Sequence, residues 1–258
     1  GYGTSQTDWS DSFDLFDLKT GYLAESTKWS TDFEKNEGTI VYQIRQGVRW
    51  GLYPALEASR LVGGRALTTD DVISELKRAT TWSRAYVYGT IPELRNIPIV
   101  KTGPWEITLK VPISSLYAAL ARLGDAMYLH PPEVIAKYGD ANKWTSSVGT
   151  GPFMLTDFVP GSQTALVRNP NYWMKDPIGP GKGNQLPYLD GVRVLIIPDK
   201  STEQAAMRTG KIDRLTGITW EDAAQLRKTN PALKEAPGSL MSGIAPIYIN
   251  TARKPFTD

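Results

Sequence analysis

Three segments of the chain place an apolar residue at every second position. Residues 39–46, 105–111 and 192–196 each alternate apolar and polar side chains. Successive side chains of a β-strand point to opposite faces, so a period of two predicts strands with one buried face. We predict further strands in two parts of residues 149–169, joined at Pro160-Gly161, and at residues 212–215 and 244–249.

Between these strands, apolar residues recur every three or four positions behind residues that can cap a helix. Thr68, with Asp71 three residues later, forms a capping box, and Val72 and Leu76 then lie on one helix face. This pattern predicts a helix that ends near Thr80. Similar signals predict helices from Ser114 or Ser115 to Gly124, from Pro131-Pro132 to Gly139, from Ser201 to Gly210, and from Thr219 to Asn230-Pro231.

Strands and helices mix along the whole chain. There is no long helical repeat, no strict βαβ rhythm and no internal repeat of fixed period. The pattern therefore favours a mixed α/β or α+β class over a helical bundle or a β-sandwich. Residues 169–190 are rich in glycine and proline, which predicts a surface loop.

Composition narrows the class of protein. The 258 residues are 41% hydrophobic, and 29 basic against 27 acidic residues leave a net charge of +2. The charges are scattered, so neither nucleic acid nor an anionic membrane is an expected partner. No apolar run reaches the roughly 18 residues of a transmembrane helix. The chain opens at Gly1-Tyr2-Gly3 without a basic-then-apolar segment, and we expect a chain from which any signal peptide has been removed.

The sequence offers little for nucleophilic or thiolate chemistry. It contains no cysteine, which excludes disulfides, thiolate zinc sites and cysteine nucleophiles. Its single histidine, His130, precedes two prolines, and no Gly-x-Ser-x-Gly nucleophile motif accompanies it. We predict a structural His130, no catalytic residues, no metal site and no cofactor.

Phosphate-binding motifs fail on spacing. The glycine-rich run at residues 179–183 lacks the Gly-x-x-x-x-Gly-Lys-Ser/Thr order, and Met154 stands where a dinucleotide fingerprint after Gly149 and Gly151 needs a third glycine. A glycosidase needs two carboxylates at a set distance in space, and spacing along the sequence does not show whether two of them meet it. A carbohydrate-binding or carbohydrate-hydrolysing protein therefore stays an alternative, as does a structural, adhesin-like module.

One stretch carries a specific family pattern. Residues 148–153 read Val-Gly-Thr-Gly-Pro-Phe, Phe158 and Gly161 follow, and residues 168–173 read Arg-Asn-Pro-Asn-Tyr-Trp. This order resembles the most recognisable motif of the family 5 extracellular solute-binding proteins. Similar matches occur in the same order at residues 23–26 with Trp29, 42–50, 67–72, 137–140, 143–145, 210–213 and 249–258.

The resemblance implies a type II periplasmic-binding-protein fold. It implies that residues 1–20 and 146–258 form an incomplete first lobe, that residues 21–145 form an inserted subdomain, and that the second lobe is absent from this sequence. Residues 51–65 replace a short turn of the family, and we expect them to be a surface elaboration. Gly149 and Gly151 are expected to serve a positive φ or a close backbone approach, with Tyr172 and Trp173 as packing anchors.

The implied function is solute binding for an ABC importer. In this family an oligopeptide or another small solute binds between two lobes that close by hinge motion, and the closed form meets an ABC permease. No bond is made or broken, so the chain is not expected to be an enzyme. Nickel complexes, opines, haem and oligosaccharides are bound on the same fold. The implied location is periplasmic or at the cell surface, including as a lipoprotein.

The resemblance also implies where a solute would be contacted. Met127 matches an arginine of the nickel-binding branch that meets anionic chelates, so an uncharged residue there favours peptides. A first lobe without its return segment is expected to leave an exposed edge or apolar face that promotes self-association. The expected ligand-binding residues are Tyr86, Tyr88, Met127, Gly217, Ile218 and Thr219.

Overall fold

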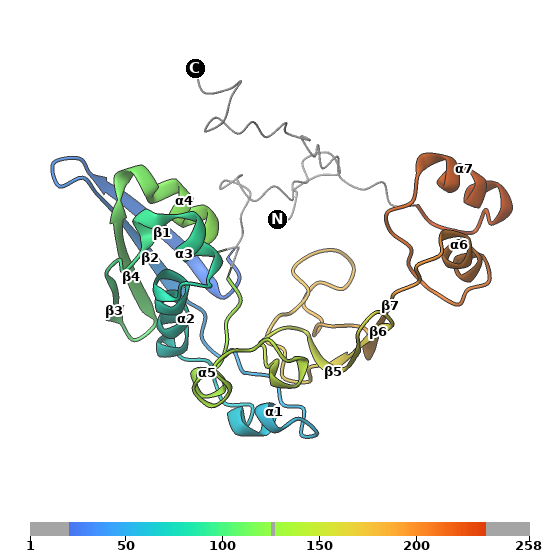
Figure 1. The fold of residues 1–258 in the computed structure, drawn as a ribbon, viewed down its shortest axis with the longest axis horizontal. Coiled ribbons are helices and arrows are strands. Elements are labelled where there is room, and N and C mark those ends of the chain that lie inside the picture. The colour runs from blue at the N-terminus through green and yellow to red at the C-terminus, as the bar shows by residue number, and fades with distance from the viewer. Residues whose placement is uncertain (1–20, 125–126, 236–258) are drawn as a thin grey trace, which may run out of the picture.

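The computed structural model describes residues 21–124 and 127–235. The strand predicted at residues 244–249 and the family match at residues 249–258 lie outside them. The described chain contains two separate antiparallel sheets, and a pair of helices, α6 and α7, lies beyond the second sheet (Figure 1). The mixed class predicted from the pattern is confirmed.

The first sheet has four strands, of which two were predicted. Its spatial order is β1 (Ala24–Asp32), β2 (Glu37–Ile44), β4 (Glu106–Pro112) and β3 (Ile99–Gly103). The alternating segments at 39–46 and 105–111 form β2 and β4, so those predictions are confirmed. β1 escaped prediction because it is an edge strand whose mostly polar side chains are exposed, which leaves no burial period in its sequence.

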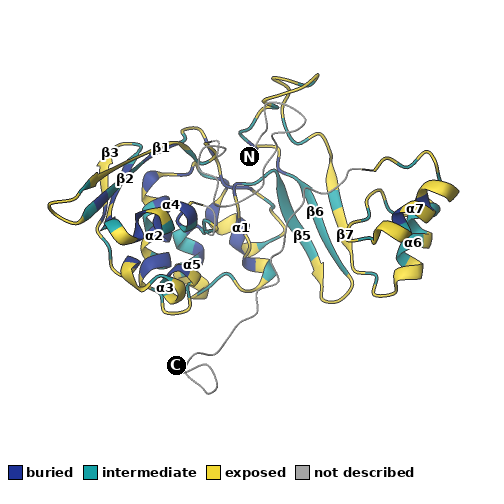
Figure 2. Cartoon of the chain, turned by 90° about the horizontal axis from the view of Figure 1, so that it is seen from above, coloured by how far each residue is buried: buried dark blue, intermediate teal, exposed yellow. Residues whose placement is uncertain are grey.

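One face of this sheet forms the hydrophobic core. Residues of β2 alternate between buried and partly buried, and Ile40 pairs with Leu109 of β4, so that both side chains enter the core. Helix α4 contacts β2 and β4, and α2 contacts β3 and β4. The buried residues gather in this part of the chain (Figure 2).

The helices and short 3-10 segments are α1 (Glu57–Val62), α2 (Thr69–Thr81), α3 (Tyr86–Thr90), η2 (Pro92–Leu94), η3 (Ile113–Ser115), α4 (Leu116–Arg122), α5 (Pro132–Tyr138), η4 (Trp144–Ser146), α6 (Lys200–Arg208) and α7 (Trp220–Thr229).

Helix caps test the sequence signals residue by residue. The capping box at α2 is present, with the Asp71 amide donating to Thr68 Oγ1 at 3.3 Å. Thr219 caps α7 as predicted. The prediction for α6 was wrong by two residues, because Asp199 is the cap and its Oδ1 accepts from the Thr202 amide at 2.8 Å. An aspartate accepts this bond as well as a serine does, so the preceding carboxylate starts the helix earlier.

The second sheet contains β5 (Phe153–Val159), β6 (Gln163–Arg168) and β7 (Gly191–Leu195) in that order. Gly161, at φ 71°, turns the chain between the first two strands. All three strands were predicted. The strand predicted at 212–215 does not form; that segment pairs with no strand in the described chain, and its order Ile-Asp-Arg-Leu lacks the period of two that a half-buried strand shows.

Residues 51–65 are not a surface elaboration. They contain α1, whose Ala58 and Val62 are buried in the core, four residues apart and so on one helix face. The expectation of a surface elaboration failed because α1 has 6 residues, and the four-residue spacing that indicates a buried helix face occurs in it only once. Gly63 then ends α1 at φ 64°, a conformation that a residue with a Cβ rarely adopts.

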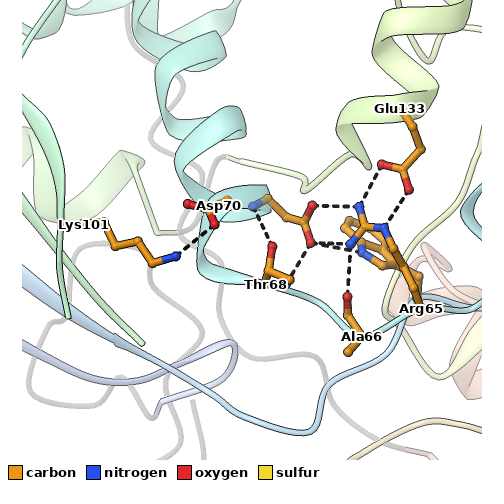
Figure 3. Close-up of polar contacts among 8 residues, drawn as sticks. Arg65, Ala66, Thr68, Asp70, Lys101 and Glu133 are labelled. Atoms are coloured by element: carbon orange, nitrogen blue, oxygen red, sulfur yellow. Dashed lines mark hydrogen bonds and ion pairs between the residues drawn. The ribbon is translucent and has the colours of Figure 1, made fainter. Parts of the chain in front are cut away.

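The segment ends in an ion-pair cluster that we call the Arg65 clamp: Arg65, Asp71 and Glu133. The guanidinium donates two hydrogen bonds to the Asp71 carboxylate, at 2.7 and 2.8 Å, and two to Glu133, both at 2.7 Å (Figure 3). The clamp therefore joins the chain after α1 to the first turn of α2 and the start of α5. Bidentate guanidinium–carboxylate pairs fix geometry as well as charge.

Both carboxylates of the clamp have a lowered pKa. Burial raises the pKa of Asp71, but hydrogen bonds from Arg65 and from the Thr68 amide outweigh it, so the pKa lies below the ordinary value. The hydrogen bonds from Arg65 are the main reason that the pKa of Glu133 is lowered. Both groups are therefore ionised in the fold at neutral pH.

Candidate functional site

A groove of about 1060 Å³ lies on the first sheet, beside the start of the second. Its wall and rim come from β1, from residues 127–130 and from residues 147–151. Its floor is apolar and belongs to the core, formed by Tyr42, Ile44, Val72, Leu76, Leu120 and Leu123. A large concave surface with an apolar floor is the usual form of a small-molecule site.

The register of β1 explains why the groove is open. Trp29 pairs with Ile40 and Thr27 with Tyr42, and paired residues of antiparallel strands lie on the same sheet face. Ile40 and Tyr42 are buried, whereas Trp29 remains 50% exposed. Helix α4 contacts β2 and β4 and meets β1 at Tyr117, whose ring lies 5.8 Å from that of Trp29, while most of β1 stays exposed and forms one side of the groove.

The glycine motif at residues 149–151 forms another side. The Gly51 amide donates to Gly149 O at 2.8 Å, and Asn169 Nδ2 donates to Gly151 O at 2.9 Å. Asn169 is buried, so its amide holds this loop from inside. Neither Gly149 nor Gly151 has a positive φ, and no atom approaches within 3.4 Å of where their Cβ atoms would stand, so the expectation for them was wrong. Both line the groove.

The Arg-Asn-x-x-Tyr-Trp motif packs against the start of β1. The Trp173 ring lies edge-on to Tyr22 with centroids 5.1 Å apart, and the Arg45 guanidinium lies 4.5 Å from its ring centre. Arg45 Nε also donates to Tyr22 O at 2.7 Å, and the Tyr22 and Tyr172 hydroxyls are 2.8 Å apart. We call Tyr22, Arg45, Tyr172 and Trp173 the junction cluster. It joins the loop after β6 of the second sheet to the residues that flank β1 and β2 of the first sheet.

Two ionisable groups other than tyrosine line the groove among the described residues, Glu25 and His130. Glu25 pairs with Arg45 at 3.1 Å. His130 Nδ1 lies 3.1 Å from Glu75 Oε2, and Arg78 pairs with the same carboxylate at 2.8 Å. Burial raises the pKa of Glu75, but hydrogen bonds with His130 and Arg78 outweigh it and lower the pKa below its ordinary value. Among the described lining residues there is one carboxylate, Glu25, whereas a glycosidase uses a pair.

The predicted ligand-binding residues do not surround one cavity. Met127 lines the groove. Tyr86 and Tyr88 lie on α3 outside its lining, Tyr86 exposed and Tyr88 stacked under the Arg95 guanidinium at 4.3 Å. Gly217, Ile218 and Thr219 precede α7, beyond the second sheet (Figure 1).

Sequence reasoning missed several groove residues. Trp29 and Tyr42 both belong to segments that match the family pattern, and the alternation at 39–46 also places Tyr42 on a strand, but neither pattern predicts a binding role for them. The signal that could have found them is the long-range pairing of the motif segments, which the sequence alone does not give.

Residues 21–124 and 127–235 lack two further features. No helix there is long and apolar enough to cross a membrane. No group of three or more His, Asp or Glu side chains is placed to hold a metal ion.

Comparison with known proteins connects these motifs to one family. Residues 20–258 match the model of the bacterial extracellular solute-binding proteins, family 5 Middle. A probable ABC transporter-binding protein of Deinococcus radiodurans is 27% identical over 225 residues, which cover 80% of this chain and 34% of the relative. The glutathione-binding protein GsiB of Salmonella choleraesuis is 30% identical over 174 residues, covering 66% of this chain and 30% of that protein. The chain thus spans about a third of the length of these curated relatives.

Solved structures show the same fold. The oligopeptide-binding protein AppA of Bacillus subtilis, in complex with a nonapeptide, aligns with a TM-score of 0.59 at 21% identity, over 81% of this chain and 37% of that one. The protein MoaA of A. tumefaciens R10, in complex with mannopinic acid, aligns with a TM-score of 0.62 at 22% identity, over 92% and 43%. The family model covers nearly the whole chain, and the chain therefore belongs to the family 5 bacterial extracellular solute-binding proteins.

Proposed function

We propose that this chain is part of the solute-binding component of an ABC importer and that it binds a peptide or similar small solute in the groove. The observation that carries the proposal is the position of the groove: the glycine motif of residues 149–151 forms its side, and the core of the first sheet forms its floor. A solute in the groove would make apolar contacts with the floor. A second lobe would cover the open side of the groove.

We further propose the division into an inserted subdomain at residues 21–145 and a first lobe at residues 1–20 and 146–258. The composition of the sheets supports it, because β1 to β4 all belong to the first range and β5 to β7 to the second. Tyr86, Tyr88, Met127 and residues 217–219 would then be contacts of a solute held between complete lobes. A periplasmic or cell-surface location and docking on an ABC permease belong to the same proposal.

Solute binding is tested by calorimetry on two proteins, residues 1–258 and the complete protein that the gene encodes. We expect the complete protein to bind trialanine amide. The shorter chain should bind weakly or not at all, because an open groove leaves the ligand partly hydrated. Micromolar binding by residues 1–258 alone would show that the site is misplaced. Failure of the complete protein to bind any peptide would refute the peptide-binding proposal.

We also propose that the chain self-associates through β7. This strand is an edge of the second sheet, and it exposes Val194, Leu195 and the adjoining Ile196. An exposed apolar edge strand is a template for pairing with a second copy.

Light scattering tests this association. Val194→Lys should shift the protein towards monomer, because a charge on the edge disfavours burial. The matched control is Val100→Lys, since Val100 is 53% exposed against 52% for Val194 but lies on β3 of the other sheet. A wild-type protein that stays monomeric at high concentration would contradict the proposal.

A further inference from the structure

His130 reaches the groove from a buried polar site. It lies in the extended segment before α5, lines the groove, and keeps 24% of its side chain exposed. Its Nδ1 contacts Glu75, whose carboxylate is 5% exposed and lies on α2. The imidazole therefore bridges a buried anion and the groove.

The contacts of Nδ1 determine which nitrogen carries the proton. Ionised Glu75 can only accept hydrogen bonds, so the 3.1 Å contact from Nδ1 to Oε2 requires a proton on Nδ1. Arg78 Nη2 lies farther from Nδ1, at 3.3 Å, and it already donates to Glu75 Oε1 at 2.8 Å. In the neutral ring the lone pair is then on Nε2. Nε2 is separated from Nδ1 by Cε1, and no described residue forms a hydrogen bond with it.

The remaining described lining of the groove offers no basic side chain to an anion. No Lys or Arg is among its described lining residues, and Glu25, its one carboxylate, is already paired with Arg45. A carboxylate in the groove would lose hydration without gaining a counter-ion, which is strongly unfavourable. An amide or ammonium N–H would instead find an acceptor in the imidazole.

We propose that His130 Nε2 accepts a hydrogen bond from an amide or ammonium N–H of the solute, with Glu75 holding the ring in the tautomer that makes this possible. The inference rests on the proposed solute-binding function and adds the chemical group that this wall recognises. Glu75 acts as a positioning residue, because it contacts the imidazole and does not line the groove.

Nitrogen NMR tests the tautomer without any ligand. His130 is the single histidine, so residues 1–258 give one pair of imidazole ¹⁵N signals. At a pH where the ring is neutral, we expect Nδ1 to be protonated and Nε2 to be unprotonated. Glu75→Gln, which can also donate to Nδ1, should reduce this preference. A wild-type ring protonated on Nε2 would overturn the proposal.

Calorimetry on the complete protein tests the contact. We expect trialanine amide and N-acetyl-trialanine amide to bind at least about tenfold more tightly than N-acetyl-trialanine, whose terminus is a carboxylate. His130→Phe should weaken binding of the amides by about tenfold, while His130→Gln, which keeps an acceptor oxygen, should lose less. Equal affinities of the His130→Phe variant and the wild type would overturn the inference and leave solute binding standing. Absence of peptide binding by the wild type would refute both.

Discussion

Replacing Arg65 with methionine is expected to lower the free energy of unfolding by about 2–3 kcal/mol. The change leaves Asp71 5% exposed and ionised without its cation, with the Thr68 amide at 2.8 Å as its main remaining partner. Breaking a buried ion pair by removing one partner typically costs about 3–5 kcal/mol, and we take less because Arg65 is 36% exposed and therefore partly screened. Urea denaturation followed by circular dichroism measures the change.

The dependence of the free energy of unfolding on pH distinguishes a contribution from the ionised carboxylates of the Arg65 clamp from a contribution of apolar packing. Asp71 and Glu133 have lowered pKa values in the fold, so the unfolded chain binds protons more readily than the folded chain does. The stability that they contribute is present at neutral pH and is lost as the pH falls below the ordinary values of 3.8 and 4.5. In Arg65→Met, the free energy of unfolding should fall less steeply as the pH is lowered.

An exposed pair serves as the control for Arg65. Lys35 contacts Asp32 at 2.8 Å, and the lysine side chain is 74% exposed. Lys35→Met should change stability by less than about 1 kcal/mol. If both substitutions have the same small effect, the clamp does not stabilise the fold as we describe.

Replacing Trp173 with alanine is expected to lower the free energy of unfolding by about 3 kcal/mol and to loosen the second sheet from the first. The indole packs against the core cluster, the Tyr22 ring and the Arg45 guanidinium, so alanine removes the centre of the junction cluster. Hydrogen exchange should then show faster opening of β5 and β6 than of β2 and β4.

The matched control is Trp220→Ala. Trp220 begins α7 and is 76% exposed, so its loss should change stability by no more than about 0.5 kcal/mol. Trp173→Phe keeps an aromatic ring and should recover much of the loss. Unchanged protection of β5 and β6 in Trp173→Ala would mean that the two sheets are held together elsewhere.

The fold was predictable where one element supplies its own signal. The alternation of β2 and the capping box of α2 depend on neighbours in sequence, and both predictions are confirmed. β1 and α1 carry no such signal. β1 is an edge strand whose side chains are mostly exposed, and α1 is so short that the four-residue spacing of its buried side chains occurs only once, which is too little to predict a helix. The segment at 212–215 lacks a period of two, and it forms no strand.

The candidate site depended on contacts that no local pattern contains. The glycine and tyrosine–tryptophan motifs were noticed as a family signature, and the structure now gives their contacts: Asn169 holds Gly151, and Arg45 lies against Trp173. The groove itself is formed by β1, the core face of the first sheet and residues 127–130 and 147–151, which only tertiary packing brings together. Of the six residues proposed from the resemblance, Met127 lines it.

The connectivity of the first sheet bears on the order in which it forms. β1 and β2 are joined by a tight turn in which the Lys35 amide donates to Asp32 Oδ1 at 3.0 Å and Asn36 adopts φ 52°. β4 joins β2 only after the chain has passed through α1, α2, α3 and β3. Closing a short loop is fast and loses less chain entropy than closing a long one, so the hairpin can nucleate early, while the pairing that completes the core sets the folding rate. Until β4 arrives, Ile40 and Ile44 are exposed on a nascent hairpin, and this interval is when the chain is most open to aggregation.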